Sequence, residues 1–170
     1  MTTETTTAAD WIAAIGQPAI DALRELVDAR DCDYDRLNEL RDGRDEWNDD
    51  DDCREDWATY HTEDAAELAG LDLARGDCGS EEDAQQRIDD DPLEIQVGGW
   101  WAPFGDPYPT EYRILLTTGG PAVRIVGDLG EHGEPCSARL EVQDWFKPWT
   151  EFPANENILS RYASSFAFAE

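Results

Sequence analysis

Basic residues are scarce in this chain of 170 residues, and lysine is nearly absent. Lys147 is the only lysine; 13 Lys and Arg in all face 40 Asp and Glu, which gives a formal net charge of −27. Nucleic acid and anionic membranes repel such a surface, so we expect the protein to bind neither directly. The same charge attracts proteins whose own surfaces are built to hold phosphates. The composition therefore predicts a basic, nucleic-acid-binding protein as the partner.

Apolar runs that could cross a bilayer are also missing, since none approaches the ~20 residues that a spanning helix needs. Residues 1–4 show neither the basic nor the apolar segment of a secretory signal. We therefore expect the protein to work in the cytosol.

Metal and cofactor motifs do not occur at the spacings that they require. His61 and His132 sit at no zinc-ligand spacing, and no two cysteines form a CxxC pair. Residues 31–42 open like a calcium loop, but Arg36 stands where that loop needs glycine. Residues 119–121 lack the spacing of a phosphate-binding glycine loop. We predict no metal and no cofactor, and we interpret the cysteines as reduced structural thiols: Cys32, Cys53, Cys78 and Cys136.

Material for catalysis is thin. His132, Cys136 and Asp144 are the one set that resembles a nucleophile with its base. His132 falls in a glycine-flanked turn, however, and no spacing holds the three side chains together. We predict that the protein is not an enzyme.

Acidic residues concentrate at one end of the chain. Residues 1–91 hold 29 Asp and Glu against 8 Arg, a net charge of −21, whereas residues 92–170 hold 11 against 5 Lys and Arg, a net charge of −6. An acidic coat that only adapts a protein to salt would cover both halves. The asymmetry predicts an acidic helical region at 1–91 and a more ordinary domain at 92–170.

Helical periodicity dominates the acidic region. A short apolar face near residues 9–15 is interrupted at Gly16 and Pro18, and one long amphipathic helix is predicted over residues 18–47. A second helix would start after the run of aspartates that ends at residue 52 and stop near Leu68, with Gly70 as its C-cap. The two would form an antiparallel hairpin. Ser80 would cap a third, short helix.

After Pro92 the period changes to two, which is typical of strands. Four strands joined in sequence imply an antiparallel meander, and residues 156–168 suit a closing helix across one sheet face. The predicted fold class is α+β, with an acidic N-terminal helical hairpin arm before the sheet. The four predicted strands cover residues 93–97, 111–118, 122–129 and 139–143.

Carboxylates recur at three- or four-residue steps along the predicted long helix and continue into the run that follows it. A helix of ~28 residues is ~42 Å long, comparable to about twelve base pairs of DNA, so a row of carboxylates could imitate a duplex edge. The alternative is a solvated face with no partner. The predicted partner-binding residues are Asp35, Glu39, Asp42, Asp45, Glu46, Asp49, Asp50, Asp51, Asp52, Glu55 and Asp56.

Aromatic residues gather beside the predicted turns of the sheet domain. They either plug the core between sheet and loop or form an exposed patch for a partner protein. The predicted secondary patch consists of Trp100, Trp101, Trp145 and Trp149.

Several segments of the chain carry a family resemblance: residues 32–37 (CDYDRL), 114–125 (ILLTTGGPAVRI), 131–135 (EHGEP), 140–145 (LEVQDW) and 148–150 (PWT). In these the chain resembles uncharacterised small acidic proteins encoded by phages and integrated mobile elements of proteobacteria. The resemblance covers most of residues 30–170. It implies a setting in the cytosol of an infected host, where small acidic phage proteins often act as anti-restriction or anti-CRISPR proteins.

The leading functional hypothesis is therefore inhibition by mimicry, in which the acidic arm blocks the basic DNA-binding channel of a host defence nucleoprotein. Two alternatives stay open. The aromatic patch of the sheet domain could be the binding surface while the acid only keeps the protein soluble, or the acidity could be salt adaptation without any acidic binding site.

Overall fold

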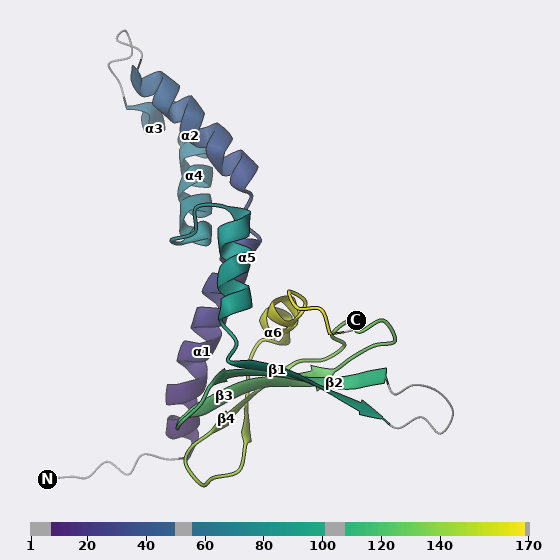
Figure 1. The fold of residues 1–170 in the computed structure, drawn as a ribbon. Helices are drawn as coiled ribbons and strands as arrows, with labels where there is room; N and C mark the ends of the chain where they lie inside the picture. Colours follow the sequence, from purple (N-terminus) through teal and green to yellow (C-terminus); the bar gives the residue numbers. More distant parts are fainter. Residues whose placement is uncertain (1–7, 50–55, 101–107, 169–170) are drawn as a thin grey trace, which may run out of the picture. The chain divides into compact units, whose positions relative to one another are not determined.

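The computed structural model describes residues 8–49, 56–100 and 108–168, which contain six helices and five strands (Figure 1). The α+β class predicted from the sequence is confirmed. The chain forms two compact units: Met1–Val27 with Gln86–Glu170, here called the sheet unit, and Asp28–Gln85, here called the helical unit. The segment that ends at Val27 thus belongs with the sheet, although the charge pattern groups it with the acidic region.

The sheet unit is built on an antiparallel meander whose strand order follows the chain order. The sequence predicts a meander, but the predicted count of four strands is wrong because a fifth strand pairs with the fourth. This last strand has three residues, too few to show a period of two, yet its Phe152 is buried. The strands are β1 (Glu94–Trp100), β2 (Tyr108–Thr117), β3 (Ala122–Asp128), β4 (Arg139–Gln143) and β5 (Thr150–Phe152).

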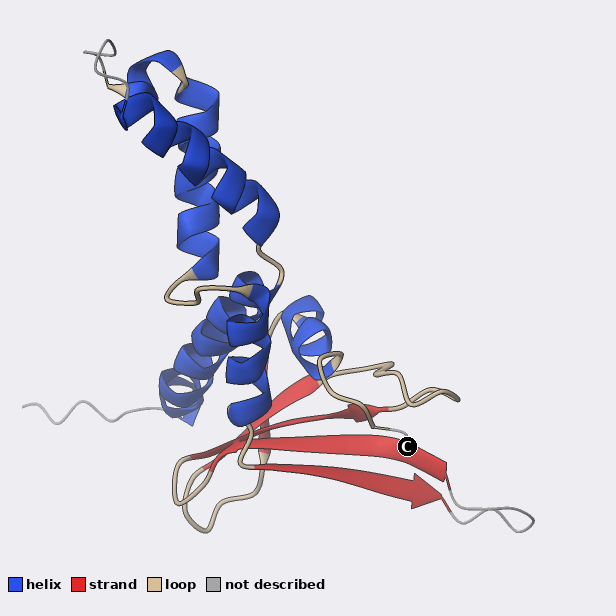
Figure 2. Cartoon of the chain, turned by 45° about the horizontal axis from the view of Figure 1, so that its top comes forward, coloured by secondary structure: helices blue, strands red, loops and turns tan. Residues whose placement is uncertain are grey.

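One face of the sheet is covered by helices α1 (Ala8–Arg30) and α6 (Glu156–Ala163), which lie on the same side in Figures 1 and 2. Alternate residues of β3 and β4 point into this layer, as the period of two predicts. The core joins side chains that are all under a tenth exposed: Ile20, Leu23 and Val27 of α1, Ile114, Ile125, Leu140 and Val142 of the sheet, and Ile158, Leu159 and Tyr162 of α6.

Tyr162 ties α6 to the segment that leads into the sheet. Its side chain is fully buried, and its hydroxyl donates a hydrogen bond of 2.6 Å to the Asp91 carboxylate. Burial and the acceptor carboxylate both raise the pKa of Tyr162 above its ordinary value. Asn155 caps α6 by accepting the backbone N–H of Asn157, so the predicted closing helix is present, though it ends at residue 163.

Helix α1 runs through Gly16 and Pro18 without a break, contrary to the predicted interruption. Pro18 removes one N–H from the helix, but the apolar face on both sides of it packs on the sheet core and outweighs that loss. Gly16 is needed for this packing because a Cβ at that position would overlap the ring of Phe152.

We expect Gly16→Ala to destabilise the sheet unit by about 1–3 kcal/mol, because the added methyl overpacks a filled contact. The control is Gly70→Ala, since Gly70 lies in a helix with open space around it. That change should stabilise the helical unit by about 0.4–1 kcal/mol. Urea unfolding of both variants checks the prediction, and equal effects of the two changes would contradict it.

The predicted helix over residues 18–47 is in fact two helices, α1 and α2 (Tyr34–Asp49). The second begins after Asp33, whose carboxylate accepts the backbone N–H of Arg36 as an N-cap. Tyr34 fixes the break by donating its hydroxyl hydrogen to the Ala29 carbonyl at 3.0 Å. Burial is the main cause that raises the pKa of Tyr34, to about 12.

The helical unit contains the antiparallel pair α2 and α4 (Thr62–Arg75), and the short helix α3 (Trp57–Tyr60) lies between them in the chain order (Figure 1). Four buried side chains form their common core: Leu37, Leu40, Trp57 and Leu68. Gly70 is not the C-cap that the sequence suggests. The helix continues to Arg75, and Gly76 follows it in the left-handed region, with φ 55°.

Helix α5 (Glu81–Asp90) follows the predicted signal closely. The Ser80 hydroxyl accepts the backbone N–H of Asp83 at 3.2 Å, and the Asp83 carboxylate accepts that of Gly79 at 3.0 Å. The first bond satisfies a backbone donor in the first turn of the helix, and the second ties the preceding Gly79 to it.

Candidate protein-binding surface

A row of carboxylates lies along the outer side of α2. Residues three or four apart share one face of a helix, so five predicted side chains stand together: Asp35, Glu39, Asp42, Glu46 and Asp49. All five are exposed. At ~1.5 Å per residue the row extends over ~21 Å, about half the length that an unbroken helix over residues 18–47 implies. We call these five residues the outer row.

The other predicted carboxylates are placed differently. Asp45 stands at the edge of the outer row and pairs with its neighbour Arg44 at 2.9 Å. Asp56 caps α3, where it accepts the backbone N–H of Ala58. The rest lie outside the described residues: Asp50, Asp51, Asp52 and Glu55.

Arg36 joins α2 to α4 through a cluster of three carboxylates. Its guanidinium contacts Glu67 at 2.8 Å, Asp64 at 3.3 Å and Glu39 at 3.5 Å. The hydrogen bond from Arg36 lowers the pKa of the Glu67 carboxyl below its ordinary value. A single cation therefore holds the facing acids of two helices.

A second junction between α2 and α4 is made by Asp72. Its carboxylate contacts Arg41 of α2 and, at 2.9 Å, Arg75 of its own helix. Hydrogen bonds from Arg75 and Arg41 lower the pKa of Asp72. These bonds are directed toward the seam between the helices and away from the outer row.

These arginines neutralise little of the negative charge of the outer row. Among the residues that the structure describes, Asp35, Asp42, Glu46 and Asp49 take part in none of the ion pairs with arginine. The whole helical unit holds 22 Asp and Glu against 6 Arg, a net charge of −16. The sheet unit is the longer of the two, yet it holds only 18 Asp and Glu against 7 Lys and Arg, a net charge of −11. The helical unit is therefore the more densely charged.

We expect Arg36→Gln to lower the urea midpoint of the helical unit strongly in low salt, because the variant leaves carboxylates facing one another without their cation. Near about 1 M salt the midpoint should fall only slightly, because salt screens this repulsion. Far-UV circular dichroism gives the midpoint. The control is Arg44→Gln, which removes the same charge from the same helix. The ion pair that it breaks is the one with the adjacent Asp45, within α2.

The effect of Arg36→Gln also has a pH signature. Because the hydrogen bond from Arg36 depresses the folded-state pKa of Glu67, its contribution to stability is present above the ordinary pKa of a glutamate and is lost as pH falls through the lowered folded-state pKa. The stability difference between wild type and Arg36→Gln should therefore be constant around neutral pH and should close in acid, as Glu67 becomes protonated. A gap that widens in acid would contradict this assignment.

A groove that the sequence did not predict lies between α2, α3 and α4. It has a volume of about 450 Å³, and we call it the Trp47 groove. Its signal in the sequence is the pair of tryptophans on either side of the acidic run, but only the short helix α3 brings them together. The residues that matter below are Glu39, Glu46, Trp47, Trp57, His61 and Asp64.

The predicted aromatic patch is only partly visible. Trp145 is 62% exposed, and the adjacent Phe146 is fully exposed with φ 60°, so neither plugs the core. Trp149 is half-buried beneath the guanidinium of Arg124, which lies 4.0 Å from its ring centroid. Trp100 is the last residue of β1, and Trp101 lies outside the described residues.

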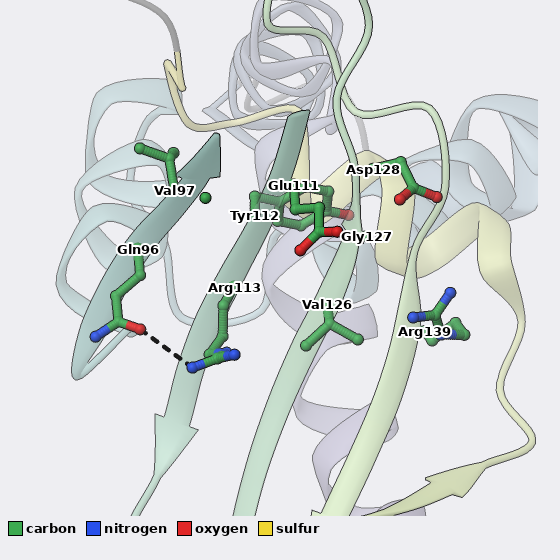
Figure 3. A pocket seen from close by; sticks show the side chains of 10 residues that line it. Gln96, Val97, Glu111, Tyr112, Arg113, Val126, Gly127, Asp128 and Arg139 are labelled. Carbon is green, nitrogen blue, oxygen red and sulfur yellow. Dashed lines mark hydrogen bonds between the residues drawn. The ribbon is translucent and has the colours of Figure 1, made fainter. Parts of the chain in front are cut away.

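The face of the sheet opposite α1 and α6 holds a shallow pocket of about 220 Å³ (Figure 3). Arg113 and Arg139 lie in one row with Val126 between them, and Arg113 donates a hydrogen bond to Gln96 at 3.3 Å. Glu111 and Asp128 form the next row. Two cations beside two carboxylates leave the pocket with no net charge, so it does not extend the acidic surface.

The three residues considered for catalysis all belong to the sheet unit. His132 and Cys136 lie between β3 and β4, whereas Asp144 follows β4 and pairs with Lys147 at 3.1 Å. Cys32 and Cys78 pack within the helical unit, and burial raises the pKa of the Cys32 thiol. Within residues 8–49, 56–100 and 108–168, no three His, Cys, Asp or Glu gather to hold a metal, and no helix is both long and apolar enough to cross a bilayer.

Comparison with protein-family models, with curated proteins and with solved structures returns no match for this chain.

Proposed function

We propose that the protein inhibits a host defence nucleoprotein by imitating nucleic acid, with the outer row of α2 in the place of phosphates. The observation that carries the proposal is the row itself: exposed carboxylates at helical spacing, four of which pair with no arginine in the described part of the chain. A cleft lined with Lys and Arg would exchange its phosphate contacts for these carboxylates.

The spacing of the row supports this proposal. Carboxylates three or four residues apart rise ~4.5–6 Å along the helix, and phosphates of one DNA strand repeat every ~3.4 Å of duplex axis. The ~21 Å of the row therefore matches the edge of about six base pairs. A rigid helix presents these charges with little loss of conformational freedom on binding.

The resemblance to small acidic proteins of phages and mobile elements supports the choice of target class. In that setting the proposed target is a CRISPR surveillance complex or a restriction enzyme, and the proposed location is the host cytosol. The basic channels of such complexes hold nucleic acid, and binding to them should be strongly salt-dependent.

Neutralising the outer row should weaken target binding by at least about two orders of magnitude in low salt, since close charge pairs across an interface are strongly coupled. The row variant combines Asp35→Asn, Glu39→Gln, Asp42→Asn, Glu46→Gln and Asp49→Asn. Both proteins serve as bait in proteobacterial lysate, washed at graded salt. Proteins retained by the wild type should be nucleic-acid-binding and should be released by added duplex DNA.

A control variant of the same net charge removes five exposed carboxylates from the sheet unit: Glu94→Gln, Glu111→Gln, Glu131→Gln, Glu151→Gln and Glu156→Gln. It should bind like the wild type. The mimicry proposal fails if both variants lose affinity equally. It also fails if the row variant retains the same proteins as the wild type and added duplex DNA does not release them.

The aromatic patch is the second candidate, because Trp145 and Phe146 are exposed side by side, with ring centroids 6.1 Å apart. Large exposed aromatics often anchor protein partners. In this alternative, Trp145→Ala with Phe146→Ala would abolish capture while the row variant would bind normally. Salt adaptation alone is disfavoured by the unequal charge densities of the two units.

A further inference from the structure

The Trp47 groove combines aromatic surface with carboxylates. The His61 ring stacks on Trp57 with centroids 5.4 Å apart and meets Trp47 edge-on at 5.1 Å. Trp57 is buried, whereas Trp47 and His61 are partly open to solvent. The groove therefore has a packed aromatic floor with accessible rings at its side.

The charge at the groove is negative. Glu39 and Asp64 share Arg36, while Glu46 contacts no arginine among the described residues. With Arg36 counted as a lining residue and His61 as neutral, three carboxylates against one cation leave a net charge of −2. The groove repels an anion, and an apolar guest would strip water from carboxylates without replacing their hydrogen bonds.

A guanidinium satisfies both halves of this site. Its flat, weakly hydrated face stacks on an indole, and its N–H groups bond carboxylates in pairs. A lysine ammonium is compact and strongly hydrated, so it gains less from the aromatic wall. Glu46, next to Trp47 in the sequence, is an acceptor that none of the arginines in the described ranges occupies.

We infer that the Trp47 groove binds an arginine side chain of the target protein. The inference rests on the proposed function, because that function places α2 against a basic surface. Glu39 and Glu46 belong to both the outer row and the groove, so an arginine in the groove would lie directly beside the carboxylates that replace phosphates. Nucleic acid has no counterpart to this aromatic pocket, which would add selectivity for one target among many basic channels.

The first experiment titrates the full-length protein with hexa-arginine and, separately, with hexalysine. Indole N–H resonances are followed by NMR, with that of Trp47 assigned from Trp47→Phe. Hexa-arginine should bind about fivefold to tenfold more tightly than hexalysine and should shift the Trp47 and Trp57 resonances. The resonances of Trp11, Trp145 and Trp149 in the sheet unit should stay in place.

The second experiment compares two matched variants. The groove variant carries Glu39→Gln, Glu46→Gln and Asp64→Asn, and the control variant carries Asp42→Asn, Asp49→Asn and Glu63→Gln. Each removes two charges from α2 and one from α4. The groove variant should lose the preference for arginine, whereas the control should keep it at a slightly lower affinity. Glu46→Gln alone, which breaks no ion pair with arginine among the described residues, tests the site if the groove variant fails to fold.

The outcomes separate the two proposals. Suppose that the groove variant and the control variant each bind hexa-arginine and hexalysine with equal affinity, and that neither peptide moves the Trp47 resonance. The groove inference is then overturned, while mimicry by the outer row stands. If the arginine preference survives the groove variant or Glu46→Gln, the guanidinium binds elsewhere and the inference also falls. If neither peptide binds the wild type even in low salt, the acidic surface does not attract basic partners, and the proposed function fails with it.

Discussion

Repulsion among carboxylates is the constraint on which the helical unit depends. Its 22 Asp and Glu are opposed by only six arginines. The structure meets this demand by placing Arg36 and Arg41 at the seam between α2 and α4, where each binds acids of the facing helix. The small apolar core of Leu37, Leu40, Trp57 and Leu68 lies between these junctions.

This use of the arginines has a functional side. Cations at the seam stabilise the pair of helices, and among the five carboxylates of the outer row they pair only with Glu39 within the described residues. In the proposed function, this arrangement leaves the other four carboxylates of the row for the cations of a partner, although their mutual repulsion makes the surface costly to assemble. Under that proposal, Glu39 would serve both stability and binding, and the other four carboxylates of the row would serve binding alone.

The sequence predicted the regular helices and strands better than the boundaries between them. The period of two placed β2, β3 and β4 because each buries alternate residues on one covered face. It missed β5, whose three residues are identified by pairing with β4 and not by pattern. Pro18 and Gly70 look like helix boundaries in the sequence, but packing on both sides carries the helices through them. The break at Asp33 was hidden because an N-cap aspartate looks like one more acid on an acidic face.

The outer row could be predicted because it depends only on spacing within one helix. The groove could not, since Trp47 and Trp57 are distant in the helical pattern and are linked through His61, which follows α3. The seam arginines were equally invisible, because their partners Glu67 and Asp72 on α4 are each 31 positions away in the sequence. Periodicity carries no information on such pairs. Local physics is readable in one chain, whereas contacts between helices need the assembled structure.

The sheet unit is discontinuous in sequence, and this affects how the protein is made. Ile20, Leu23 and Val27 leave the ribosome before the helical unit, but they find their core partners only after β2 and the later strands emerge. The last residue of the helical unit is Gln85, so this unit can fold before the core partners of α1 have been synthesised. The acidic unit is thus an insertion whose two ends return to one fold. Its two boundaries fall inside α1 and α5, so any segment put in its place would have to continue both helices.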